Sequence, residues 1–195
     1  MVHRFFLKLS QVMAYLGGVM LVGLILLVCM SVVGRSLNGI LHSDLIAATI
    51  PGIATFLLNL GIGPVNGDFE LIEAGVAFSI FAFLPLCQIT GGHASVDIFT
   101  SRFPAGVNRV LRTVTEVLFA GVLVLIAWTL SQGMLSKMNS GQTTFLIEFP
   151  LWWAYALSLT GAVVAAFVGV YLALARLGEL VTGRIILPVD LGADP

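Results

Sequence analysis

The stretch VMAYLGGVMLVGLILLVCMSVV, residues 12–33, contains no charged side chain and decides the kind of fold that this chain adopts. An α-helix needs about 20 apolar residues to cross the hydrocarbon core of a bilayer. A secretory signal has a shorter apolar region that ends at a small-residue cleavage site, and neither feature is present here. We therefore interpret residues 12–33 as a retained transmembrane helix.

Three further stretches have the same character, and they lie at about residues 72–92, 116–136 and 149–175. Their only charged residues, Glu73 and Glu116, fall in the first turn. Continuous apolar runs of this length are helices, because barrel strands alternate in polarity and run about 10 residues. The sequence therefore predicts an all-α integral membrane protein, a single membrane domain over residues 1–195 with four transmembrane helices.

The composition agrees with a lipid environment and excludes several classes of function. The chain is 58% hydrophobic and 10% charged, with a mean hydropathy of +1.06, whereas a soluble domain is about 25% charged. A net charge of −1 gives no basic field for nucleic acid. Cys29 and Cys87 lie in apolar runs without a CxxC motif, so neither a zinc site nor a disulfide scaffold is predicted.

The segment between the first two predicted helices, residues 36–69, contains a second apolar stretch. Residues 45–67 carry Pro51, Pro64 and several glycines, and their clean apolar part covers only residues 53–62. That part is too short to cross the hydrocarbon core. We predict a short helical element that lies along or dips into the membrane surface within the first periplasmic loop.

Two segments have the apolar spacing of amphipathic helices, at the N-terminus and at residues 94–114. The second carries Arg102, Arg109 and Arg112, which we predict to contact membrane lipids, because basic amphipathic helices lie in the interface and favour anionic lipid. Pro104 is expected to divide this segment, since proline interrupts a helix interior.

The placement of basic residues predicts the orientation. With four spans and an inside N-terminus, two basic residues lie outside, Arg35 and Lys137, and seven lie inside: Arg4, Lys8, Arg102, Arg109, Arg112, Arg176 and Arg184. This asymmetry follows the positive-inside rule better than either five-span alternative. Both termini are therefore predicted to be cytoplasmic.

Ionisable residues gather at the ends of the spans, and the middles contain none. Glu70 and Glu73, spaced i, i+3, could bind a cation or act in acid–base chemistry, or they could complement a helix dipole. His93 and Asp97, spaced i, i+4, could orient a ligand or partner, or form a local hydrogen bond. Because a charged residue inside a membrane is the usual mark of a transport site, the empty middles indicate a chain that does not transport by itself.

Other motifs point away from cofactor chemistry. The three histidines, His3, His42 and His93, all lie outside the middles of the spans, so bis-histidine haem is not predicted. No catalytic or nucleotide-binding motif occurs, and we predict neither an enzyme nor a cofactor. Pro150, Trp152, Trp153 and Tyr155 open the fourth span, where Trp and Tyr are typical of the membrane interface.

Together these motifs resemble the small permease (Q) subunit of tripartite ATP-independent periplasmic (TRAP) transporters. The resemblance is carried by GDFELIE at residues 67–73, GHASVD at 92–97, Phe103-Pro104, and FPLWWAY at 149–155. The family shows G-x-x-E-L-x-E, G-H-I-x-V-D, L-P and P-x-W-x-x-Y in the same order. The chain departs from the pattern at Ala94 and in the long segment 42–66.

The resemblance implies a scaffold in the bacterial inner membrane. Its partners would be a large (M) permease subunit, which carries the substrate and sodium sites, and a periplasmic solute-binding protein that delivers a carboxylate. Glu70, Glu73, His93, Asp97, Pro150, Trp152, Trp153 and Tyr155 become candidate subunit-interface or structural residues. The alternative function is a haem-free membrane anchor of a multi-subunit oxidoreductase, which neighbouring genes for redox subunits would indicate.

The first prediction concerns topology. Reporter fusions at Ser43, Gly92, Ser140 and the C-terminus should report outside, inside, outside and inside, because the basic residues favour cytoplasmic termini. Paired alkaline phosphatase and green fluorescent protein fusions measure this. A periplasmic C-terminus would contradict the four-span topology.

Overall fold

The computed structural model describes residues 2–43, 46, 51–92 and 103–182, and five helices are found in these ranges. They are α1 (Val2–Leu41), α3 (Pro51–Asn59), α4 (Asp68–Ile89), α5 (Ala105–Ser140) and α6 (Leu151–Thr182). In the described ranges, α1, α4, α5 and α6 are long and apolar enough to cross a membrane. The prediction of an all-α protein with four transmembrane helices is confirmed, and α3 lies within the segment where a short helical element was expected.

Three helices extend beyond the spans predicted for them: α6 continues to Thr182, and α1 and α5 extend further still. α1 begins at Val2, so the amphipathic N-terminus and the first span form one continuous helix. α5 begins directly after Pro104, which has an extended backbone, and it continues past Arg109 and Arg112 to Ser140 without a break. A proline suits this position, because its missing N–H costs nothing before the first turn. The amphipathic residues of 105–114 are therefore the first turns of the third span.

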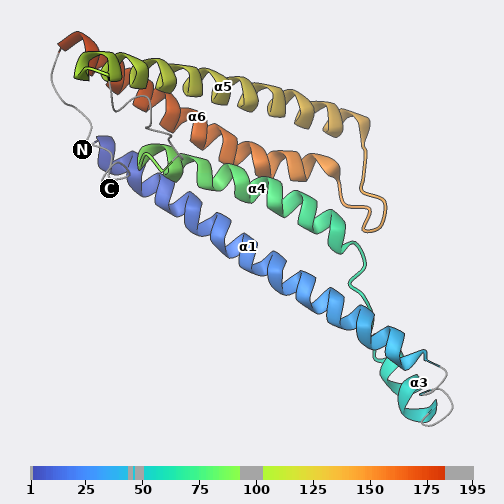
Figure 1. Cartoon of the computed structure of the whole chain (residues 1–195). Coiled ribbons are helices and arrows are strands. Elements are labelled where there is room, and N and C mark those ends of the chain that lie inside the picture. Colours follow the sequence, from blue (N-terminus) through green and yellow to red (C-terminus); the bar gives the residue numbers. More distant parts are fainter. Residues whose placement is uncertain (1, 44–45, 47–50, 93–102, 183–195) are drawn as a thin grey trace.

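The four long helices lie side by side in a row in the order α1, α4, α6, α5 (Figure 1). α4 packs between α1 and α6, and α5 packs on the far side of α6. The start of α1 packs against the second half of α6, where the rings of Phe6 and Tyr171 stack with their centroids 4.5 Å apart. The start of α1 and the second half of α6 thus lie toward the same end of the bundle, as an even number of spans requires.

We call this the inner end, and the end where α4 and α6 begin the outer end, which the orientation prediction places toward the periplasm. α4 has 22 residues, a length of about 33 Å at 1.5 Å per residue, close to the hydrocarbon core of about 30 Å. α1 has 40 residues, or about 60 Å. α1 therefore continues past the first residue of α4 at the outer end (Figure 1).

The protruding part of α1, residues 36–41, together with α3 forms an element that we call the outer spur (Figure 1). The chain that leaves α3 packs back on α1, where the Asn38 amide donates a hydrogen bond to the Ile62 carbonyl at 3.0 Å. Gly34 contacts the Gly63 backbone so closely that a Cβ on Gly34 would lie 2.1 Å from the Gly63 oxygen. The chain that follows α3 is therefore attached to α1 by a backbone contact that only a glycine at position 34 permits.

Small residues bring the central helices together. Ala82 of α4 and Ala162 and Ala165 of α6 have no exposed surface. A Cβ on Gly161 of α6 would lie 2.8 Å from the Phe81 Cβ of α4. Because lipid is as apolar as the side chains, helices in membranes associate by this close packing rather than by a hydrophobic driving force.

The second prediction tests this contact. Gly161→Ala should destabilise the bundle by about 1–3 kcal/mol, because the added methyl group overlaps Phe81 and the α4 backbone. Thermal unfolding in detergent, followed by fluorescence-detected size exclusion, measures the change.

Gly18→Ala is the matched control. Gly18 is also inside a long helix, so it gains the same helix propensity, but nothing lies within 4 Å of the point that a Cβ on Gly18 would occupy. Equal melting temperatures for the two variants would contradict close packing at Gly161.

Candidate functional site

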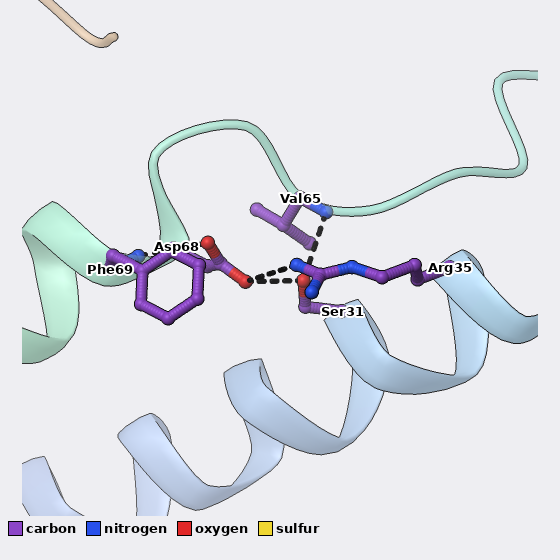
Figure 2. A network of polar contacts seen from close by, with 5 residues as sticks. All are labelled: Ser31, Arg35, Val65, Asp68 and Phe69. Atoms are coloured by element: carbon purple, nitrogen blue, oxygen red, sulfur yellow. Dashed lines mark hydrogen bonds and ion pairs between the residues drawn. The ribbon is translucent and has the colours of Figure 1, made fainter. Parts of the chain in front are cut away.

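The outer end holds a buried acidic node centred on Asp68, the first residue of α4 (Figure 2). Asp68 is only 7% exposed. Its Oδ2 accepts a hydrogen bond from the Ser31 hydroxyl of α1 and lies 3.7 Å from the Arg35 guanidinium nitrogen Nη2. Its Oδ1 accepts the backbone N–H of Phe69 at 2.9 Å. Both carboxylate oxygens are thus satisfied, as a buried charge requires.

The same node holds the chain that enters α4. Ser31 is buried, and its hydroxyl accepts a hydrogen bond from the Val65 N–H at 3.3 Å (Figure 2). Arg35 also lies over the Phe69 ring, 6.0 Å from its centroid. The Arg35 side chain is 58% exposed, so its ion pair with Asp68 adds little stability, and the hydroxyl bridge is the more important contact. The node fixes where α4 starts relative to α1.

A second contact joins α4 to the connection between α5 and α6. Residues 141–150 form an outer hairpin in which the Thr144 N–H donates to the Phe149 carbonyl at 2.8 Å and the Leu151 N–H donates to the Gln142 carbonyl at 3.0 Å. Glu70 accepts the N–H groups of Leu146 and Ile147, one on each carboxylate oxygen, at 2.7 and 3.1 Å.

Gly67 completes this contact. Its φ of +74° is one that L side chains rarely adopt, and a Cβ there would lie 2.1 Å from the Ile147 side chain. Glu70 is therefore a clasp that holds the outer hairpin against the start of α4, rather than a free acid.

A pocket of about 270 Å³ opens beside the clasp, between α4, α5, α6 and the outer hairpin. It brings together three of the residues singled out in the sequence, Glu70, Glu73 and Tyr155. Deeper in the helices its walls are apolar, formed by Ala77, Phe81 and Leu130. Within the described ranges, no group of three His, Cys, Asp or Glu side chains is placed to hold a metal ion.

The remaining candidate residues from the sequence do not line this pocket. Pro150 pairs with Thr143 at the base of the outer hairpin. The rings of Trp152 and Trp153 meet edge to face at 5.8 Å, and half of Trp153 is exposed, which is typical of an interfacial aromatic belt. Arg109 and Arg112 are exposed near the start of α5, and their lipid contact stays a prediction. His93, Asp97 and Arg102 lie outside the described residues.

The fold and its polar groups define a multi-pass membrane protein whose described ionisable residues lie toward the two ends of its helices. A comparison with protein families identifies it further: the family of tripartite ATP-independent periplasmic transporters, DctQ component, matches residues 24–179. The match covers most of the chain, so the chain belongs to this family and is a small membrane subunit of a TRAP transporter. No curated protein and no solved structure matches it significantly.

The third prediction concerns the clasp. Glu70→Ala should raise the hydrogen-exchange rates of the Leu146 and Ile147 amides severalfold, because both lose their acceptor. Hydrogen–deuterium exchange with mass spectrometry of the 141–150 peptide measures this.

Glu73→Ala is the control, since it removes a carboxylate one turn along the same helix that has no hydrogen bond to the hairpin among the described residues. Unchanged exchange in Glu70→Ala would show that other contacts hold the hairpin.

Proposed function

We propose that this subunit is a static scaffold for the large permease subunit in a bacterial inner membrane, and that its outer end helps to dock the periplasmic binding protein. The transporter would use a sodium gradient to take up a carboxylate-type solute, as the family resemblance implies. Neither substrate nor sodium would bind to this chain.

The observation that carries the proposal is the uncharged, continuous middle of the four long helices. The charged residues of α4 lie in its first two turns, and those of α6 lie in its last two. A chain that bound a charged solute would need ionisable groups or interrupted helices near the midplane. α1, α5 and α6 run without a break over 40, 36 and 32 residues. Such helices support a rigid part better than a moving one.

The row arrangement supports the scaffold role. α1 and α5 form its two edges (Figure 1), and both carry large apolar side chains that the chain itself leaves exposed, such as Val19 and Trp128. A flat apolar edge suits packing against another membrane protein, because van der Waals contact drives helix association in lipid.

The outer spur and outer hairpin are the elements best placed for docking. Phe56 of α3 is 64% exposed, and Phe145 at the hairpin tip is 95% exposed. The described residues between 36 and 67 include no Asp, Glu, Lys or Arg. Apolar side chains that the chain itself leaves exposed beyond the start of α4 are costly in water, and a partner docked at the membrane surface would cover those that lipid does not.

The fourth prediction tests both roles in proteoliposomes with a sodium gradient. This chain alone should give no saturable carboxylate uptake, whereas the chain with the large subunit and the loaded binding protein should. In the full system, Phe56→Glu should raise severalfold the concentration of binding protein that gives half-maximal uptake, because a charge disrupts apolar docking.

Ser140→Glu is the matched control, since it adds the same charge at an exposed outer position on α5. Uptake by this chain alone would overturn the scaffold role. A Phe56→Glu system with unchanged half-maximal concentration would overturn docking at the spur and leave the scaffold role intact.

A further inference from the structure

The pocket beside the clasp has features that the scaffold role does not explain. Its outer mouth carries Glu70, Glu73 and Thr144, and its inner walls are Ala77, Phe81 and Leu130. Its acidic side chains therefore lie toward the outer end, beside the apolar Phe149 and Leu151, whereas the lining further along α4 and α5 is apolar. No Lys or Arg lines it, so its electrostatic potential favours a cation.

Three polar side chains line this pocket without a hydrogen bond among the described residues: the exposed Glu73, the half-buried Tyr155 and the buried Ser158. Glu70 differs, because both of its oxygens are occupied by the outer hairpin. Ser158 is only 3% exposed, yet it lines the pocket. Because buried polar groups nearly always have a partner, the hydroxyl of Ser158, which opens onto the pocket, is available to a molecule bound there that would supply one.

The depth of each group in the pocket predicts which part of a bound molecule it would contact. Glu73 lies in the second turn of α4, Tyr155 and Ser158 lie in the second and third turns of α6, and Phe81 lies further in. A cation that donates hydrogen bonds belongs at Glu73, an acceptor such as a phosphate or ester oxygen belongs near the two hydroxyls, and a hydrocarbon chain belongs at Phe81 and Leu130.

We propose that this pocket binds one phosphatidylethanolamine molecule of the outer leaflet, with its ammonium group on Glu73. The order of the groups from mouth to depth is that of an aminophospholipid standing in a bilayer. A primary ammonium also has N–H donors for a carboxylate, which gives charge-assisted hydrogen bonds. The bound lipid would bridge α4 and α6 beside the clasp. This inference does not depend on the solute that the transporter carries.

Native mass spectrometry of the full-length chain tests the proposal. The chain is equilibrated with vesicles of equal parts phosphatidylethanolamine and phosphatidylglycerol and then extracted in mild detergent. The wild-type chain should retain one phosphatidylethanolamine in preference to phosphatidylglycerol. Glu73→Gln should lower this preference about tenfold, the size expected for loss of one charged hydrogen-bonding partner.

Two variants control for charge and folding. Glu148→Gln makes the same charge change on the exposed outer hairpin, outside the pocket lining, and should retain the lipid. Ala77→Leu keeps every charge but fills the apolar wall, and it should also lose the lipid. Both variants should elute as the wild type does in size exclusion.

Two further binding experiments test whether the bound ammonium group belongs to phosphatidylethanolamine. Phosphatidylcholine, which has the charge but no N–H donor, should not replace phosphatidylethanolamine. Free ethanolamine should not compete, because it lacks the hydrocarbon chain. Equal retention by wild type and Glu73→Gln would overturn the proposal. A photo-crosslinker at Tyr155 that captures the large subunit in the assembled transporter, with no lipid retained, would also overturn it and assign the pocket to that subunit.

Discussion

The structure depends on the close approach of α4 to its two neighbours. Gly17 of α1 faces Ala82 on one side of α4, and Gly161 of α6 faces Phe81 on the other. With no hydrophobic driving force in lipid, these close contacts at glycine hold α1, α4 and α6 together, and α5 joins them by packing on α6. They also bring the start of α4 beside Ser31 and beside the outer hairpin, so the Asp68 node and the Glu70 clasp form on a packed frame.

The four spans were predictable because each is a local property of the sequence. An apolar run of sufficient length forms a helix in a membrane wherever its neighbours lie, and the structure has helices at all four predicted positions. The short helix α3 was also predictable from local sequence, because Pro51 and Gly63 bracket an apolar core that is too short to cross. The starts of α1 and α5 were not, because the spacing of apolar residues is the same in an amphipathic segment and in a continuing span.

The polar contacts at the outer end could not be derived from local pattern. Ser31 and Asp68 are 37 residues apart, and Glu70 and Leu146 are 76 apart, so each pair depends on how the helices dock. The sequence marked Glu70, Glu73 and Tyr155 as candidates but gave them no common location. It left Ser31, Arg35 and Asp68 out of the candidates altogether. An aspartate directly after Gly67, at the start of an apolar helix, was the signal that could have found the last of these.

The shortness of α4 makes the subunit sensitive to hydrophobic mismatch. At about 33 Å, α4 is barely longer than the hydrocarbon core is thick. Its outer end carries Asp68 and Glu70. A thicker bilayer would draw these carboxylates toward hydrocarbon, and a thinner one would uncover apolar side chains, so the lipid must adjust around this helix. α1 is much longer and can tilt instead. The subunit therefore sets the thickness of the membrane immediately around it, including any membrane that it shares with its partner.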